Sequence, residues 1–212
     1  MNCIYSHLGK YIKYTPTFRY IRSSLFNNKI TIDHVAHRTF NYDNLKYHYM
    51  DNKFALKKDK YVFENINVES TWLKSHCFRV FLSQYRGENN FKINSFADYK
   101  KIQKENDYVA WTLLHRDDIN HVAIQVDDIE DVIKRIRQDG TVILNNEEDP
   151  IEVSRDGKLL QASTVSDKIS YKFEDGNVHL VPYTFVEFIQ RIDGREGFET
   201  KNAARIFTST HL

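Results

Sequence analysis

The sequence is poor in several features that mark particular classes of protein. Its 212 residues include only two cysteines, Cys3 and Cys77, and three prolines. Cys3 stands at the terminus and Cys77 lies in an apolar strand-like stretch, so we expect no structural disulfide and a reduced, cytoplasmic setting. No stretch approaches the roughly 20 apolar residues of a membrane-spanning helix. The first residues also lack the continuous apolar run of a secretion signal.

Neither sign of charge is in surplus. The chain has 30 basic and 29 acidic residues, which gives a formal net charge of +1. This balance argues against nucleic acid or an anionic membrane as the partner, because both favour a basic surplus. We find no glycine-rich phosphate loop, no Ser-His-Asp arrangement and no paired catalytic cysteines. An aromatic content of 14% fits an ordered globular protein long enough to bury a core.

A short phrase occurs twice in the chain. Ile32–Ala36 reads Ile-Asp-His-Val-Ala, and Ile119–Ala123 reads Ile-Asn-His-Val-Ala, so that His34 and His121 are 87 positions apart. Each copy opens a run that alternates as a strand does. The repeat predicts a duplicated module in which each copy contributes one imidazole to a shared centre.

The first copy lies in a strand that we place at residues 28–40. Simple alternation puts six residues on one face: Ile30, Ile32, His34, Ala36, Arg38 and Phe40. His34 and Arg38 are then roughly 13 Å apart between α-carbons, at about 3.3 Å per residue. His37 falls on the opposite face and is a poor candidate for the same site.

The rest of the chain reads as an α+β domain. Further strands are expected at 53–63, 76–85, 119–126, 141–145, 158–165, 168–174 and 178–191. Helices are expected on both sides of Pro16, after Ser95 with Asp98 three residues on, after a cap at Asp107, and from a cap at Asp127 or Asp128 to Gly140. Asp175-Gly176 predicts a hairpin between the last two strands.

These elements predict a single domain spanning residues 1–212. The second half has the order β-α-β-β-β, and we interpret the first half as the same order with a degraded helix. The segments are a helical cover (1–27), module 1 (28–94), a helical connection (95–118), module 2 (119–193) and a helical tail (194–212) that could close over the site.

The final predicted strand contains an isolated acid. Glu187 is the only acidic residue between Asp175 and Asp193, and its neighbours are apolar. Burying such a carboxylate costs several kcal/mol unless it is paired or bound to a metal. By alternation Glu187 shares a face with Tyr183 and Arg191.

His34, His121 and Glu187 are therefore candidate metal ligands. Two imidazoles and one carboxylate suit a divalent iron that keeps positions open for substrate and oxygen. The alternative is that they are ordinary buried polar residues, since nine histidines are present. Arg38 is a candidate for binding a substrate carboxylate, although arginines are more often at the surface. Ser163 and Tyr183 are further substrate-binding candidates.

Several segments, taken in order, resemble one family. They are IDHVAHRTF (32–40), ESTWL (69–73), NHVAIQV (120–126), LLQASTVSDKISYKFEDG (159–176), VEFIQR (186–191) and REGFE (195–199). The ordered set resembles the 2-oxoadipate dioxygenase/decarboxylase (2-hydroxyglutarate synthase) family of the vicinal oxygen chelate superfamily. The strand VEFIQR is also similar to the corresponding strand of 4-hydroxyphenylpyruvate dioxygenase.

This resemblance implies paired βαβββ modules in a half-open, glyoxalase/dioxygenase-like barrel, with N-terminal and inter-module helices. It implies Fe(II) held by His34, His121 and Glu187, with Arg38 binding substrate and acting in catalysis. The implied reaction is the O2-dependent conversion of 2-oxoadipate to 2-hydroxyglutarate and CO2, with a small 2-oxo acid and O2 as partners. Two alternatives remain open: a metal-dependent lyase or isomerase of the same superfamily, and a non-catalytic metal- or ligand-binding module.

Overall fold

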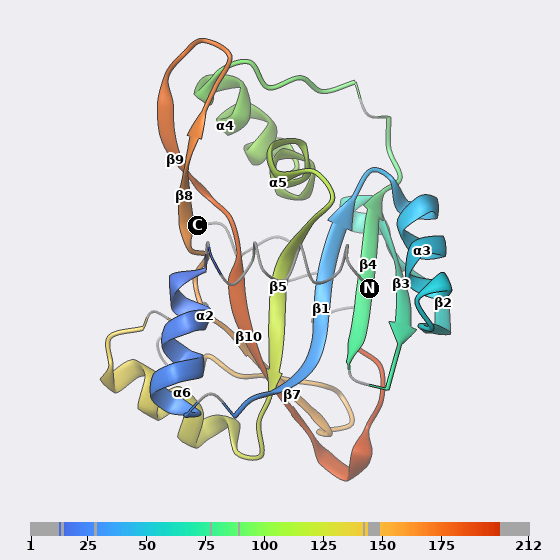
Figure 1. Ribbon diagram of the computed structural model, residues 1–212, viewed down its shortest axis with the longest axis vertical. Helices are drawn as coiled ribbons and strands as arrows, with labels where there is room; N and C mark the ends of the chain where they lie inside the picture. Colours follow the sequence, from blue (N-terminus) through green and yellow to red (C-terminus); the bar gives the residue numbers. More distant parts are fainter. Residues whose placement is uncertain are drawn as a thin grey trace.

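The computed structural model describes residues 13, 15–27, 29–76, 78–88, 90–141, 143 and 149–199 (Figure 1). Their helices and helical turns are α2 (Pro16–Tyr20), a π-helical turn (Ile21–Leu25), α3 (Tyr42–Asp51), a 3-10 turn (Glu64–Ile66), α4 (Phe96–Glu105), α5 (Asp107–His115), α6 (Ile129–Gln138) and a 3-10 turn (Ile192–Gly194). Their strands are β1 (Thr31–Thr39), β2 (Ala55–Phe63), β3 (Val68–Lys74), β4 (Arg79–Tyr85), β5 (Asp118–Gln125), β6 (Glu152–Val153), β7 (Leu159–Ser163), β8 (Lys168–Lys172), β9 (Val178–Pro182) and β10 (Phe185–Arg191).

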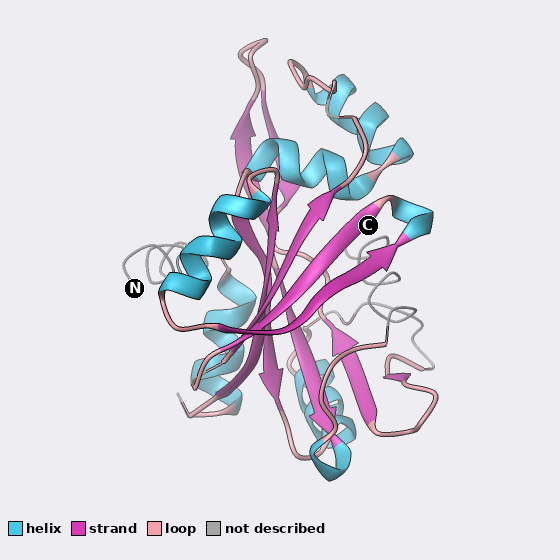
Figure 2. Cartoon of the chain, turned by 90° about the vertical axis from the view of Figure 1, so that its right-hand side faces the viewer, coloured by secondary structure: helices cyan, strands magenta, loops and turns pink. Residues whose placement is uncertain are grey.

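Eight of the described strands form one sheet in the order β2-β3-β4-β1-β5-β10-β7-β6. Figure 2 shows the twist of this sheet. In the first half β1 pairs in parallel with β4, and β4 continues through β3 to β2. In the second half β5 pairs in parallel with β10, and β10 continues through β7 to β6. The two halves therefore have the same connectivity, and they join where β1 pairs antiparallel with β5. This arrangement confirms the expected fold class, as a sheet whose edges, β2 and β6, stay apart.

The second half differs from the expected strand order in two respects. The first is β6 (Glu152–Val153), which lies outside every predicted strand. The second is the predicted strand 178–191, which is wrong as a single element because the chain leaves one sheet at Tyr183-Thr184 and enters another. Among the described strands β9 pairs with β8 alone, in a separate hairpin whose Asp175-Gly176 turn has Gly176 at φ 85°. Pro182, the last residue of β9, has no N–H to extend a ladder. The β8–β9 hairpin is thus an insertion between β7 and β10.

One strand of the first half was not predicted. β3 lies between β2 and β4, and most of its side chains are buried, polar Ser70 and Thr71 included. Burial on both faces removes the alternation of apolar and polar residues from which a half-exposed strand is predicted.

The helices follow their local signals, with one correction. Ser95 and Asp98 form a reciprocal capping box at the start of α4, and Asp128 caps α6 by accepting from the Asp131 N–H. The expected cap at Asp107 is wrong. The side chain of Asn106 accepts from the Val109 N–H, so that α5 begins one residue earlier than a cap at Asp107 would allow.

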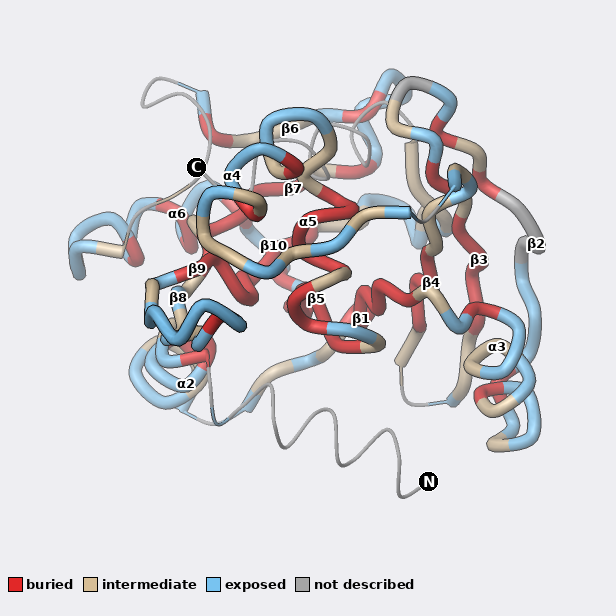
Figure 3. Tube along the Cα trace, turned by 90° about the horizontal axis from the view of Figure 1, so that it is seen from above, coloured by how far each residue is buried: buried red, intermediate tan, exposed pale blue. Residues whose placement is uncertain are grey.

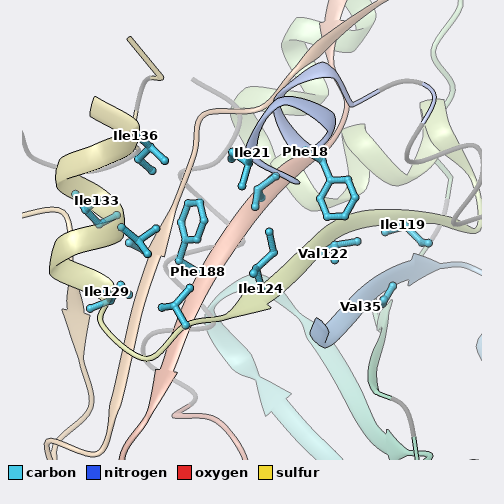
Figure 4. Packing of buried hydrophobic residues seen from close by; sticks show 14 residues of the cluster. Phe18, Ile21, Val35, Ile119, Val122, Ile124, Ile129, Ile133, Ile136 and Phe188 are labelled. Carbon is cyan, nitrogen blue, oxygen red and sulfur yellow. The ribbon is translucent and has the colours of Figure 1, made fainter. Parts of the chain in front are cut away.

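The main core lies between one face of the sheet and helices α2 and α6 (Figure 4). Ile124 of β5 and Phe188 of β10 lie on the side of the sheet that faces Ile129, Ile133 and Ile136 of α6. Val122 of β5 lies beneath Phe18 of α2 in the same cluster. Burying each of these side chains stabilises the fold by about 1.5–3 kcal/mol. This apolar layer fixes the orientation of β1, β5 and β10, which are buried over most of their length (Figure 3).

Two β-bulges interrupt the pairing of β1 with β5. The register shifts once between Ile32 and His34 and again between Ala36 and His37, where β5 steps from His121 to Ile119. Each bulge switches which side chains face the core. Ile32 packs in the main core together with Val35, so the expectation that Ile30 and Ile32 share a face with His34 is wrong.

Some expectations fall on residues outside those described. They are the helix before Pro16, both cysteines, most of the strand at 141–145 and the tail beyond residue 199. Within the described residues no helix is both long and apolar enough to cross a membrane.

Candidate metal centre

Three side chains from the middle of the sheet converge on one point. His34 of β1, His121 of β5 and Glu187 of β10 are all buried. The two histidine Nε2 atoms are 3.2 Å apart, and the Glu187 Oε2 atom lies 3.1 Å from the His34 Nε2 and 3.4 Å from the His121 Nε2. This is the only group of potential metal ligands of this kind within the described part of the chain.

The repeated phrase explains how the two histidines meet. Across the β1–β5 pair, His34 lies opposite Ala123 and His121 lies opposite Ala36. Each histidine therefore faces the small alanine of the other copy, and Glu187 of β10 also has Ala123 as its neighbour. The methyl groups leave room between the strands for the three polar side chains. The valine of each phrase points into the main core on the other face.

The residue before each histidine holds its imidazole. The Asp33 Oδ1 lies 2.9 Å from the His34 Nδ1, and the Asn120 Oδ1 lies 3.2 Å from the His121 Nδ1. In a regular strand, adjacent side chains point to opposite faces, but a bulge allows two consecutive residues to approach the same side. Since each Nδ1 has an oxygen acceptor, its proton is placed there and each Nε2 presents a lone pair.

The carboxylate is oriented by a neighbouring strand. Gln161 of β7 donates from its Nε2 to the Glu187 Oε1 at 2.6 Å. The Glu187 Oε2 accepts no hydrogen bond of good geometry from the described residues and points at the histidines. Three lone-pair atoms thus face one another without a proton donor between them. This is the arrangement expected when a cation belongs at their centre.

The electrostatics of the three groups differ. Burial raises the pKa of Glu187, but the contacts with His121 and His34 outweigh it and lower that pKa to about 2. Burial lowers the pKa of His121 to about 4. Burial also acts to lower the pKa of His34, but its contacts with Asp33 and Glu187 outweigh that effect and raise it. Glu187 is therefore ionised and His121 neutral at neutral pH, the forms in which both bind metals.

Arg38 is buried completely in an aromatic pocket. Its guanidinium carbon lies 4.9 Å from the ring centre of Tyr108 and 5.3 Å from that of Trp111, both on α5. Burial lowers the pKa of Arg38 to about 10, while the charge of Asp107 opposes this, so that the side chain stays cationic at neutral pH. It is close enough to His121 for its charge to lower the pKa of that residue. A buried cation beside the metal centre suits an anionic ligand.

The other predicted site residues have different surroundings. Ser163 is buried and lies directly opposite Glu187 in the β7–β10 pair. Tyr183 donates its hydroxyl to the Asp118 Oδ2 at 2.8 Å and stacks on Trp111, next to the Arg38 pocket. His37 contacts the Tyr49 hydroxyl on α3, away from the centre, as its predicted face requires. The substrate-binding roles of Ser163 and Tyr183 stay predictions.

Asp33, Asn120 and Gln161 were not among the predicted site residues. The signal for the first two was present, since an Asx residue precedes the histidine in both copies of the phrase. The alternation of a regular strand places that residue on the wrong face, and only the bulges bring it back. Gln161 has no comparable signal, because its role depends on the pairing of β7 with β10.

Comparisons with known proteins indicate the family of the chain. A family model described as 2-oxoadipate dioxygenase/decarboxylase matches residues 89–194, half of the chain. The chain is 33% identical over 136 residues to a chloroplastic 2-oxoadipate dioxygenase/decarboxylase of Arabidopsis thaliana. That alignment covers 54% of this chain but 37% of the relative, so the chain spans well under half of the relative's length.

Two solved structures have the same fold. A hydroxyglutarate synthase from Oryza sativa, in complex with 2-oxoadipate, superposes with a TM-score of 0.84 at 23% identity and covers 98% of this chain and 90% of its own. A glyoxalase-superfamily protein from Ralstonia eutropha JMP134 has a TM-score of 0.74 at 16% identity, covering 90% of this chain and 82% of its own. At these identities the two structures establish the fold alone.

Proposed function

Because the chain belongs to the 2-oxoadipate dioxygenase/decarboxylase family, we propose that it is an Fe(II)- and O2-dependent dioxygenase that converts 2-oxoadipate to 2-hydroxyglutarate and CO2. The observation that carries the proposal is the convergence of His34, His121 and Glu187, with the Glu187 Oε2 buried and without a hydrogen-bond donor. In this reaction one carboxyl group leaves as CO2, and its two oxygen atoms leave with it. Atom balance then requires both atoms of O2 to enter the five-carbon product.

The donor set fits iron. Two imidazoles and one carboxylate on one side of an ion leave the opposite side open for substrate and oxygen, which is typical of non-heme Fe(II) oxygenases. An iron ion bound here would supply coordination positions for the 2-oxo acid and O2 and would stabilise negative charge that develops on them. The roles of the protein groups follow from their own geometry.

His34, His121 and Glu187 hold the ion, and their hydrogen-bond partners hold them. Asp33 and Asn120 keep the Nδ1 protons away from the centre, so both Nε2 lone pairs stay directed inward. Gln161 binds one Glu187 oxygen and leaves the other for the metal. Such partners hold the ligands in the binding geometry before the ion arrives.

Arg38 binds the distal carboxylate of the substrate. A 2-oxo dicarboxylate has an oxo acid group at one end, which suits the metal, and a second carboxylate at the other end. Arg38 lies on the same strand as His34, and its contacts with the rings of Tyr108 and Trp111 restrict where the guanidinium can lie. A fixed fork of donors selects a carboxylate at one distance from the metal and therefore one chain length.

Aromatic side chains exclude water from the centre. The His34 ring lies 5.9 Å from the Trp72 ring and 4.8 Å from the Phe198 ring, and the His121 ring lies 4.5 Å from the Phe185 ring. An apolar surround strengthens the attraction between the metal and its anionic ligands. It also keeps water away from the reacting atoms of a bound substrate.

Oxygen uptake tests the proposal. Protein loaded with Fe(II) under anaerobic conditions is mixed with aerated 2-oxoadipate, and O2 consumption is followed with product analysis by mass spectrometry. We expect O2 loss and 2-hydroxyglutarate formation that both require Fe(II) and disappear in Glu187→Ala. Turnover that is independent of O2 would favour a lyase or isomerase. Metal retention without turnover across a panel of 2-oxo acids would favour a binding module.

A further inference from the structure

Arg191, the last residue of β10, joins two parts of the chain that are far apart in the sequence. Its Nε and Nη2 donate to the two carboxylate oxygens of Asp33, at 2.7 and 2.9 Å. Its Nη1 donates to the backbone carbonyls of Arg195 and Gly197, at 3.1 and 2.9 Å. The Arg191 side chain is 4% exposed and the Asp33 side chain is 0% exposed. One buried guanidinium thus binds the residue beside a candidate ligand and the turn at residues 195–197.

On one side, Arg191 determines where the Asp33 carboxylate can point. The Asp33 Oδ1 contacts both the Arg191 Nη2 and the His34 Nδ1, and its Oδ2 contacts the Arg191 Nε and, at 3.2 Å, the Nη1 of Arg79. A bidentate arginine pair has a fixed plane, so that the carboxylate cannot turn away from His34. It also cannot swing toward the metal centre and compete as a ligand, because both of its oxygens are occupied.

On the other side, Arg191 holds a segment that covers His34. Phe198 follows the two bound carbonyls, and its ring meets the His34 ring edge-on with a centroid distance of 4.8 Å. The same ring packs against Trp72 at 4.6 Å and Phe81 at 5.2 Å, and the Arg191 guanidinium lies 5.4 Å from its centre. Gly197 has φ 79°, and a side chain there would press on the Tyr61 hydroxyl at 3.3 Å. The backbone of the turn at residues 195–197 therefore places the Phe198 ring against the His34 imidazole.

The two histidines differ in the residue that accepts the hydrogen bond from their Nδ1 atoms. His121 has the neutral Asn120 as its acceptor. His34 has the carboxylate of Asp33, which forms ion pairs with Arg191 and Arg79. Among the described residues, the hydrogen-bond partner of His34 is thus connected through Arg191 to the segment 195–199.

We propose that Arg191 is a positioning residue that couples closure of the segment 195–199 over the site to the orientation of His34, acting through Asp33. This inference rests on the proposed metal centre. When the segment is in place, Arg191 is held by two carbonyls and presents both donors to Asp33, which in turn fixes the His34 ring. If the segment lifts, the guanidinium loses two of its four bonds and Phe198 leaves the His34 ring.

The substitution Arg191→Lys tests whether the geometry of the Arg191 side chain matters beyond its positive charge. Lysine keeps the positive charge but has no planar fork, so one ammonium group cannot bind both Asp33 oxygens and both carbonyls. The matched control is Arg86→Lys, since Arg86 also pairs with two acids, Glu64 and Glu69, but stands at the surface beyond β4. Co(II) serves as the probe because it is stable in air and its visible spectrum reports ligand geometry.

The readouts are the Co(II) dissociation constant, the Co(II) spectrum and hydrogen exchange of the backbone amides at 195–199. For Arg191→Lys we expect affinity about 10–100-fold weaker, an altered spectrum and faster exchange in that segment. Arg86→Lys should match the unaltered protein in all three. Asp33→Asn should also weaken Co(II) binding. The double variant Asp33→Asn with Arg191→Lys should bind Co(II) less than about threefold more weakly than the weaker of the two single variants. Both substitutions disrupt the same contacts between Arg191, Asp33 and His34.

The outcomes are distinct. The coupling is overturned if the Co(II) dissociation constant of the Arg191→Lys variant is within about threefold of that of the unaltered protein and the two spectra are the same. That result would leave the proposed metal centre intact. The coupling is also overturned if the loss of Co(II) affinity in the double variant equals the product of the losses in Asp33→Asn and Arg191→Lys. If the unaltered protein binds no Co(II), the proposed function fails together with the inference. If Arg191→Lys does not fold, Asp33→Asn and Phe198→Leu decide: faster exchange at 195–199 in Asp33→Asn and an altered Co(II) spectrum in Phe198→Leu support the coupling, and the absence of both overturns it.

Discussion

Loading the site with metal should stabilise the fold by an amount that can be calculated. Three lone-pair atoms of His34, His121 and Glu187 face one another within 3.4 Å. A cation that binds this arrangement in the folded state alone stabilises it by about 2.7 kcal/mol when the free metal concentration is about 100 times its Kd. For a chain of this size 1 kcal/mol corresponds to a shift in Tm of about 2–4 °C. We therefore expect Fe(II) to raise Tm by about 5–11 °C.

The assay is anaerobic differential scanning calorimetry with and without Fe(II). Glu187→Ala removes the only carboxylate of the three ligands. If its affinity is about a hundredfold weaker, the same metal concentration stabilises it by about 0.4 kcal/mol, and Tm rises by only about 1–2 °C. His179→Ala is the matched control, because His179 stacks on Phe96 far from the site in the fold and should leave the full shift. An unchanged Tm in the unaltered protein, or an equal shift in Glu187→Ala, would refute the reasoning.

Three further predictions follow from neighbouring groups. Arg38→Met should raise the KM for 2-oxoadipate by about 30-fold or more, because losing one partner of a buried charged pair costs about 2–5 kcal/mol, while the Kd for Co(II) measured by titration stays unchanged. Gln161→Leu should lower the free energy of unfolding by about 1–3 kcal/mol in a urea titration, because the Glu187 Oε1 loses its donor, and it should weaken Co(II) binding about 10–100-fold. Burial raises the pKa of Asp107 to about 6, so its neutral form is favoured on folding, and the protein loses stability as pH rises through about 6. The stability of Asp107→Asn relative to the unaltered protein should therefore increase by up to about 3 kcal/mol between pH 4 and pH 8, and a pH-independent difference in urea titrations would contradict this.

The sequence was sufficient to find the three candidate ligands, and the structure explains why. Each candidate ligand is a polar residue within an apolar strand, and this property is local. The repeated phrase gave His34 and His121, and the isolated acid in a hydrophobic strand gave Glu187. The alternation around Glu187 also holds, since Phe185 packs on His121 while Val186 and Phe188 enter the main core.

The partners of those ligands were not predictable from local pattern. Asp33 and Asn120 reach the histidines only because β1 and β5 each carry an extra residue where the two strands pair. A bulge is a property of the pair of strands, and one strand's sequence does not reveal it. For the same reason the contact of Gln161 with Glu187, and of Arg191 with Asp33, required the strand order of the complete sheet.

The meaning of the repeated phrase also became clearer from the structure. The histidine was its obvious feature, but the alanine two residues later matters as much for the site. Because each histidine lies opposite the other copy's alanine, a larger residue at Ala36 or Ala123 would fill the space between the strands. The duplication thus provides two candidate ligands together with the space that their side chains occupy.

The fate of the oxygen atoms tests the central claim most directly. Fe(II)-loaded protein is supplied with 2-oxoadipate under isotopically heavy O2, and the five-carbon product is analysed by mass spectrometry. A dioxygenase that releases one carboxyl group as CO2 must place both heavy oxygen atoms in 2-hydroxyglutarate, and this is the result we predict. A product without heavy oxygen, or one formed equally well without O2, would contradict the account.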